Sequence, residues 1–466
     1  MKKRLHISAL YGCAIFLLSV LSRPCVAKES DAPSLEDLQL TPGPEISLAQ
    51  ALARAQEQNL LLASMKQEIE KSQALFSKSL GLVLPTAQAS LSYTHLDHGS
   101  EVDLSGMIGA LTQQAVQLDP MTVQQQETLN GSISIRQSIV NVSDWFTVKA
   151  AGQAETQATL SVEKMQRELS LQVARSYFLA LSSFHLTTLQ QRLLVSARDH
   201  LRIAENRYAA GSGVRLDVLR ARADLEDTEQ ALSNARLAFD TARDALGVLI
   251  GMDGDGLPMP TEVLLPPAPV LDDETLIENA LAERTDLSLE RERVETAKIQ
   301  KTAAWTALLP ALSAVWQGTA LLTDPPDMAD PDRERWSLML SLTVPLFNSA
   351  IYADMKHRSA AHRQAVINAE NLEQTAKKEV RQAKREYITA VHDVETADRR
   401  VRILREALVL TQRAFRSGAG SSLDVTDARK NVAAGEVNLI TARLRAQSSL
   451  LSLLHAAGTN IATVVE

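Results

Sequence analysis

Two segments of this chain, 207 residues apart, carry the same pattern. The first reads Tyr208-Ala-Ala-Gly-Ser-Gly-Val-Arg-Leu-Asp217-Val, and the second reads Phe415-Arg-Ser-Gly-Ala-Gly-Ser-Ser-Leu-Asp424-Val. The same offset aligns residues 134–141 with residues 341–348. Self-similarity at a fixed offset is typical of a repeated structural unit. The chain is therefore interpreted as a tandem duplication.

The composition favours long helices over a compact enzyme core. Aromatic residues make up only 4% of the 466 residues, while Ala, Leu, Gln, Arg and Glu are abundant, which is typical of helices packed through narrow seams. No nucleophile with a base and an orienting group is evident, and no Walker, HExxH or CxxC motif occurs. We therefore expect no enzyme activity, no cofactor and no metal site. His95 and His98, which flank Asp97, are interpreted as solvated.

The first residues resemble an export signal. A basic start at residues 2–4 precedes an apolar run over residues 5–21, and small residues end at Ala27. This pattern predicts a signal peptide over residues 1–27, cleaved near Ala27, with a retained transmembrane helix as the alternative. Cleavage would remove four basic and no acidic groups, so the net charge would move from -8 to -12. Such an acidic protein is unsuited to binding nucleic acid.

Long helical patterns dominate the sequence. Residues 145–209 and 349–416 contain no proline, and each predicts one helix of roughly 100 Å at about 1.5 Å per residue. Apolar and small residues recur at a spacing of three and four over residues 394–415 and 225–249, which indicates coiled-coil packing. Helices of about half that length are predicted over residues 47–80, 216–250, 275–309 and 423–457. Two of these laid end to end match one long helix, so non-helical structure should collect at their joint as a belt.

Period-two segments follow the first half-length helix of each copy, after Leu84-Pro85 and after Leu309-Pro310. They predict β-hairpins over residues 85–141 and 310–348, whose apolar residues alternate with Ser, Thr, Gln and Arg. This is what strands need when lipid lies on one side and water on the other, although a half-buried soluble sheet gives the same alternation. The candidate lipid-facing residues are Leu91, Tyr93, Trp316, Trp336, Leu338, Leu340 and Leu342.

Four strands cannot close a barrel, and lipid cannot satisfy the two open edges of an isolated sheet. Three chains would supply twelve strands above twelve helical columns, with the loops over residues 94–131 and 324–335 outside the cell. The predicted fold is mainly α with a small transmembrane β part: a duplicated helix/β-hairpin/helix repeat forming a trimeric 12-stranded β-barrel continuous with a long α-helical (coiled-coil) barrel. The predicted parts are a signal peptide (1–27), a first repeat (28–250), a linker (251–274), a second repeat (275–457) and a C-terminal tail (458–466).

The order of helix, Leu-Pro, hairpin, long helix, aromatic-x-x-Gly turn, Leu-Asp-Val and helix, found twice, resembles the TolC-like outer-membrane factor (outer-membrane efflux protein) family. Val344-Pro-Leu-Phe-Asn348 is similar to the family's exit from the second hairpin, and Arg284-Thr-Asp-Leu287 to its Arg-Pro-Asp-Leu, with Thr285 replacing proline. The resemblance covers nearly the whole mature chain.

This resemblance implies a homotrimer in the outer membrane of a Gram-negative bacterium, extending into the periplasm. Its implied function is the exit duct of a tripartite efflux pump or a type I secretion system, a passive channel that opens when partners bind its helical tip. The implied partners are a periplasmic adaptor (membrane fusion) protein, an inner-membrane transporter and outer-membrane lipid. The alternative is a soluble periplasmic coiled-coil adaptor or scaffold, which would need neither the duplication nor lipid-facing strands.

The repeated turns are the candidate contact surface for the adaptor, unless they are merely exposed turns. Two glycines in each turn, Gly211 with Gly213 and Gly418 with Gly420, should permit the positive φ angles of a tight helix reversal. The candidate contact residues are Arg207, Tyr208, Gly211, Gly213, Asp217, Phe415, Gly418 and Gly420.

A pair of acidic residues follows the second turn. Ser421 with Asp424 three residues later is a capping-box pattern, which would give Asp424 a structural role. By the resemblance, however, Asp424 and Asp427 match the paired acids that ring the family's periplasmic constriction, where a ring of carboxylates attracts cations. The first copy has Arg220 in place of Asp427. Gly420 stands where the best-known members carry a basic latch, so we expect packing to hold the gate closed.

Overall fold

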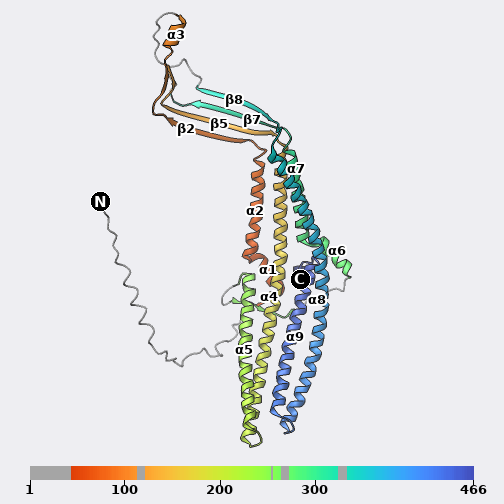
Figure 1. Ribbon diagram of the computed structural model, residues 1–466. Helices are drawn as coiled ribbons and strands as arrows, with labels where there is room; N and C mark the ends of the chain where they lie inside the picture. The colour runs from red at the N-terminus through yellow and green to blue at the C-terminus, as the bar shows by residue number, and fades with distance from the viewer. Residues whose placement is uncertain (1–42, 113–120, 253–255, 264–271, 324–332, 466) are drawn as a thin grey trace, which may run out of the picture. The chain divides into compact units, whose positions relative to one another are not determined.

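The structure is a computed structural model, and all of its described residues belong to the unit Pro42–Glu466 (Figure 1). It describes residues 43–112, 121–252, 256–263, 272–323 and 333–465. The predicted signal peptide, most of the predicted loop over residues 324–335 and part of the linker lie outside these ranges.

Helices make up most of the described chain. The two long helices are confirmed as α4 (Val142–Ala209) and α8 (Ser349–Arg416), each of 68 residues, or about 100 Å. Each begins after an asparagine, Asn141 or Asn348, whose side chain accepts a hydrogen bond from the first helical turn. The other helices are α1 (Leu48–Gln58), α2 (Leu60–Leu80), α3 (Ser105–Thr112), α5 (Arg215–Ile250), α6 (Asp273–Glu283), α7 (Thr285–Thr306), α9 (Ser422–Ala456) and α10 (Ile461–Val465).

Two of the predicted half-length helices are each broken into two in the structure. The prediction of continuous helices over residues 47–80 and 275–309 was therefore wrong. Both breaks occur at one extended residue, Asn59 with ψ 119° and Arg284 with ψ 118°. Asn59 accepts from Leu62 N at 3.0 Å and donates to Leu249 O at 3.0 Å, so its amide caps α2 and ties it to α5. The hydrogen bonds of this side chain replace those that a continuous helix would make.

Arg284 holds the second break with its guanidinium. Its Nη2 donates to Asp286 Oδ2 at 2.8 Å and its Nη1 to Glu379 Oε2 of α8 at 2.7 Å. Burial alone would raise the pKa of Asp286, but the hydrogen bond and charge of Arg284 hold it below its ordinary value. The Arg-Thr-Asp-Leu segment therefore stops one helix, starts the next and fastens both to α8.

The duplication is visible in the elements themselves. Helices α1 and α6 each have 11 residues and end at breaks 225 residues apart, whereas α4 and α8 are 207 residues apart. The first copy therefore carries 18 additional residues between its helix break and its long helix. The described part of that insertion forms α3 and a ribbon of β3 (Ser100–Val102) and β4 (Met121–Gln124), which the sequence prediction treated as loop.

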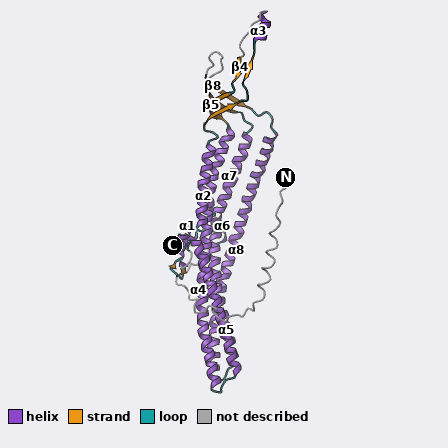
Figure 2. Ribbon diagram, turned by 90° about the vertical axis from the view of Figure 1, so that its left-hand side faces the viewer, coloured by secondary structure: helices purple, strands orange, loops and turns teal. Residues whose placement is uncertain are grey.

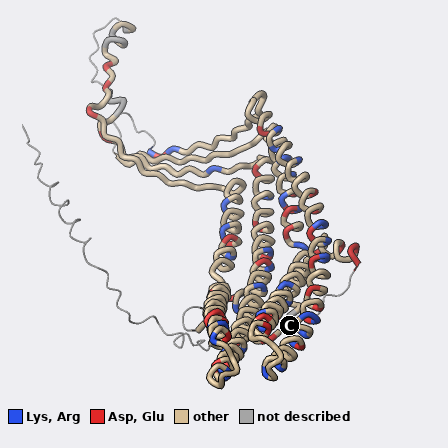
Figure 3. The backbone as a smooth tube through the Cα atoms, turned by 60° about the horizontal axis from the view of Figure 1, so that its bottom comes forward, with Lys and Arg blue, Asp and Glu red and all other residues tan. Residues whose placement is uncertain are grey.

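The two predicted hairpins join in one antiparallel sheet of order β2-β5-β7-β8. Its strands are β2 (Thr86–His95), β5 (Glu127–Val140), β7 (Ala311–Leu321) and β8 (Glu334–Thr343). Within the described chain the outer strands β2 and β8 each have one paired and one unpaired edge. Charged residues alternate along the helices, whereas the sheet is nearly free of them (Figure 3). None of the described helices has the length and apolar content needed to cross a membrane.

The helices run side by side along their length (Figure 2). Toward the sheet the order of neighbours is α2, α4, α7, α8, and toward the opposite end it is α5, α4, α9, α8. Helices α4 and α8 run through both halves, while α2 with α5 and α7 with α9 make the two stacked columns. The predicted combination of continuous helices and end-to-end pairs is therefore confirmed.

A belt of non-helical structure lies where the stacked helices meet. There β1 (Glu45–Ile46) pairs in parallel with β6 (Met259–Pro260). The largest buried cluster, drawn from α1, α2, α4, α5, α9 and α10, surrounds this joint. The fully buried Tyr177 hydroxyl lies 2.7 Å from Thr261 O and 3.0 Å from Ile46 O, and burial raises its pKa, so it stays a donor to this belt.

The variant Tyr177→Phe should lower the free energy of unfolding by about 1 kcal/mol, because it leaves buried carbonyl groups short of a donor. The midpoint of thermal unfolding, followed by circular dichroism, measures this loss. Tyr208→Phe is the matched control, since Tyr208 is half exposed. Equal midpoints for the two variants would contradict the anchoring role of Tyr177.

Candidate functional site

The two repeated turns reverse the chain through one left-handed glycine each. Gly211 has φ 71° and Gly418 has φ 83°, a conformation that favours glycine. The prediction of positive φ was wrong for Gly213 and Gly420. Each instead lies close to the preceding helix end, where an added Cβ would come within 3.1 Å of its atoms, a tight contact.

The acidic pair begins α9 at the second turn. Ser421 N donates to Asp424 Oδ2 at 3.1 Å, and Asp424 N donates to Ser421 Oγ at 3.2 Å. The capping box predicted from the sequence is therefore confirmed. Asp424 and Asp427 are both exposed, so their carboxylates remain open to solvent. In the first copy Val214 precedes α5 and provides no side-chain cap.

Two of the predicted tip residues, far apart in sequence, meet in the structure. The guanidinium of Arg207, at the end of α4, lies 4.4 Å from the centre of the Phe415 ring at the end of α8. Its Nη1 also donates to Phe415 O at 2.8 Å. Arg207 thus joins the tips of the two helical hairpins through a cation–π contact and a hydrogen bond.

A buried polar cluster joins the same hairpins one level further from the tip. Arg429 of α9 donates to Ser196 O of α4 and lies 3.4 Å from the carboxylate of Asp224 on α5, with both charged side chains buried. Burial lowers the pKa of Arg429. Burial, helped by the Arg429 charge, also lowers the pKa of the neighbouring His200, which favours a neutral imidazole.

The sequence prediction missed this cluster. Further along both repeats the sequence has Ala-Arg at the same 207-residue offset, ending at Arg222 and Arg429, but the structure exposes Arg222 and buries Arg429. The repeat pattern therefore did not reveal which of the two arginines is buried. Asp224 and His200 gave no sequence signal, because helix neighbours three and four residues apart do not reveal which face meets a different hairpin.

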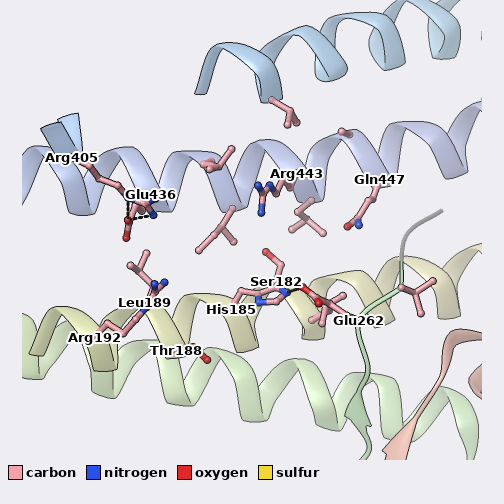
Figure 4. Close-up of a pocket in the computed structure, with 17 residues that line it drawn as sticks. Ser182, His185, Thr188, Leu189, Arg192, Glu262, Arg405, Glu436, Arg443 and Gln447 are labelled. Atoms are coloured by element: carbon pink, nitrogen blue, oxygen red, sulfur yellow. Dashed lines mark hydrogen bonds and ion pairs between the residues drawn. The ribbon is translucent and has the colours of Figure 1, made fainter. Parts of the chain in front are cut away.

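Between the tip and the belt, a cleft of about 800 Å³ separates α4 from α9. Side chains from the two helices face one another across it (Figure 4). Its lining includes apolar residues such as Leu189 and Leu439, and two exposed cations, Arg192 and Arg443, that form no ion pair with a described residue. The two coiled-coil hairpins therefore do not pack tightly along this length. Arg207 and Arg429 join them on the tip side of the cleft, and the belt core does so on the other.

The strand register places all seven candidate lipid-facing residues on one face of the sheet. Directly paired residues share a face, and Trp316 pairs with Leu338, which lies in the middle of the apolar set on β8. On β2 the apolar face carries Leu91 and Tyr93, which are 67% and 61% exposed in the isolated chain. Ser, Thr, Asn, Gln and Arg occupy most of the opposite face. The protein surface here includes a broad apolar sheet face that water alone would not stabilise.

The sequence matches a known family over most of its length. Residues 51–252 and 276–459 fit the family described as outer membrane efflux protein, one range in each repeat. The cation efflux system protein CusC of Escherichia coli (strain K12) is 23% identical over 330 residues, which cover 68% of this chain and 70% of CusC. The toluene efflux pump outer membrane protein TtgI of Pseudomonas putida is 26% identical over 313 residues, 64% of this chain and 65% of TtgI.

The fold is also shared with solved structures. The CmeC outer membrane channel of Campylobacter jejuni superposes with a TM-score of 0.74 at 18% identity, covering 88% of this chain and 85% of CmeC.

The variant Asp224→Ala should lower the local stability of the tip by about 3 kcal/mol, since it leaves the Arg429 charge buried without its partner. Faster hydrogen exchange in the adjoining turns of α4, α5 and α9 measures this change. Asp227→Ala is the matched control: it breaks only the exposed Lys430–Asp227 pair at 3.4 Å and should cost less than about 1 kcal/mol. Equal exchange rates in the two variants would show that the buried pair does not hold the hairpins.

Proposed function

The chain belongs to the outer membrane efflux protein family, and we propose that it is the outer-membrane exit duct of a tripartite efflux pump or a type I secretion system. The observation that carries this proposal is a four-stranded sheet with one apolar face and two open edges, joined directly to helices of about 100 Å. A soluble scaffold would have no use for such a face. In the outer membrane this apolar face contacts lipid, and the helices extend from the sheet into the periplasm.

The duct forms when three copies share one wall. The β2 edge of one copy pairs with the β8 edge of the next, which gives twelve strands with every backbone group satisfied. The helical layers then close in the same way, four columns from each copy. The apolar face with Leu91, Trp336 and Leu340 contacts lipid, and the polar face lines a water-filled lumen.

The periplasmic tip is the gate. Three copies of Asp424 and Asp427 place six exposed carboxylates around the axis, which favours cations in the closed duct. Opening moves the α8/α9 hairpin relative to α4/α5. The cleft between α4 and α9 gives this motion room, and the contacts of Arg207 and Arg429 resist it. This chain has Gly420 where the resemblance would place a basic latch. The contacts of Arg207 and Arg429 take the place of that latch.

A periplasmic adaptor protein and an inner-membrane transporter complete the pathway. The exposed Tyr208, Val214 and Leu216 at the first turn, and Leu423 after the second, offer apolar contacts for the adaptor. Binding of the adaptor opens the duct only by favouring the splayed arrangement over the closed one. The relatives are named for cation and toluene efflux, so the family supports export without one shared cargo.

Replacing both gate acids, as Asp424→Asn with Asp427→Asn, should lower the preference of the closed channel for K⁺ over Cl⁻. Asparagine preserves an acceptor for the capping box, so the helix start should survive. The reversal potential of single channels in a KCl gradient measures the change. Asp227→Asn, further along α5, is the control, and a selectivity equal to wild type in the gate variant would exclude these acids from the constriction.

A charge on the apolar face of β8 should prevent assembly in the membrane. Leu340→Arg should cost about 2 to 4 kcal/mol near the bilayer midplane. Its neighbour Ser341→Arg, on the opposite face, should be tolerated because it meets water. The yield of heat-resistant oligomer in outer-membrane fractions distinguishes the two, and equal yields would mean that the faces are assigned wrongly.

A further inference from the structure

The polar face of the sheet carries charge of one sign only. Within the four strands its ionisable residues are Arg136 on β5 and Arg335 on β8. The strand-end acids Glu127 and Glu334 fall on the other, apolar face by the same register. Both arginines are exposed, and neither guanidinium forms an ion pair within the described chain. Figure 3 shows how little other charge the strands carry.

These arginines lie at two levels of the sheet. Arg136 pairs with Thr86 at the helix-proximal end of β2, whereas Arg335 pairs with Thr319, four residues further along β7 than the Val315 partner of Arg136. At about 3.4 Å per residue the two levels are about 14 Å apart along the strand. Uncharged Gln and Ser side chains occupy the row between them.

We infer that Arg136 and Arg335 form two rings of three cations in the lumen of the strand barrel, which make this section of the duct select anionic solutes. The inference rests on the proposed trimeric duct. Solutes bearing carboxylate or phosphate groups fit best, because a planar guanidinium binds such groups with two parallel hydrogen bonds. Because neither arginine forms an ion pair with a described residue, these donors are available to the solute.

The dimensions allow the rings to act on solutes near the axis. Twelve strands spaced by about 4.8 Å and tilted by about 40° enclose a backbone cylinder of about 12 Å radius. Arginine side chains narrow this further, and fields reach about 8 Å at physiological salt. The rings therefore influence most of the cross-section. On the helix side, the acid Asp144 places its Oδ2 3.4 Å from Ser138 Oγ, below the level of Arg136.

The described lumen-facing charges of the strand section, Arg136 and Arg335, are then opposite in sign to those of the tip, Asp424 and Asp427. The acidic tip dominates selectivity while it is narrow, but it widens when the hairpins splay, and its field on the axis weakens with distance. A closed sheet cannot widen without breaking its hydrogen bonds. The arginine rings therefore determine the charge preference of the open duct, and the cargo class they favour is anionic.

The ion selectivity of full-length trimers in planar bilayers tests this inference. The four proteins compared are the wild type, the tip-acid variant, and the tip-acid variant carrying either the Gln or the Lys substitutions. In the Asp424→Asn/Asp427→Asn background the channel should prefer Cl⁻ over K⁺. Adding Arg136→Gln and Arg335→Gln should reduce the Cl⁻/K⁺ permeability ratio by about threefold, the change in local ion concentration produced by a potential of about one kT. Inorganic pyrophosphate added on the strand side should block the first channel and not the second.

Arg136→Lys with Arg335→Lys is the matched control, and it should keep the Cl⁻ preference while weakening the pyrophosphate block. An unchanged permeability ratio in the Gln variant, in channels that otherwise conduct normally, would overturn the arginine rings alone. Absence of any channel from the wild-type protein would overturn the proposed duct, and the rings with it.

Discussion

A β-strand with an unpaired edge cannot rest in hydrocarbon, because its N–H and C=O groups find no partner there. Each copy of this chain makes a sheet of four strands with two such edges, and one of its faces is apolar. The closure of the sheet and of the helical layer follows from the need to pair these edges. Copies must pair edge to edge until the sheet closes, and the helices that leave the sheet must close with it, since α4 and α8 begin directly after β5 and β8.

The duplication makes this closure regular. Two repeats supply matched hairpins, matched helix breaks at Asn59 and Arg284, and two 68-residue helices capped by Asn141 and Asn348. The wall therefore has nearly equal columns at every position around it. The repeats differ in two places: only the second turn carries an acidic pair, and only the first hairpin carries the insertion with α3. Charge follows the same division, with carboxylates at the tip and arginines among the strands.

Much of this architecture could be predicted from local pattern. Long proline-free segments predicted α4 and α8, and period-two alternation predicted the two faces of the sheet. The pair Ser421 and Asp424 predicted a capping box. Each of these signals lies within a few residues of sequence. The helix breaks were missed because Asn59 and Arg284 depend on partners in α5 and α8. The Arg429–Asp224 pair and the Arg207–Phe415 contact join residues about 200 positions apart. Such contacts depend on which faces of two coiled coils meet, and helical periodicity alone does not fix that.

The number of copies in the wall is the central claim, and native mass spectrometry of the protein extracted from outer membranes measures it most directly. Twelve strands from chains of four require a complex of three copies. A complex of three, converting to single chains only when the sheet unfolds, is the predicted result. A stable single chain with its sheet intact in the absence of detergent would contradict the account, because its open edges would then need no partner.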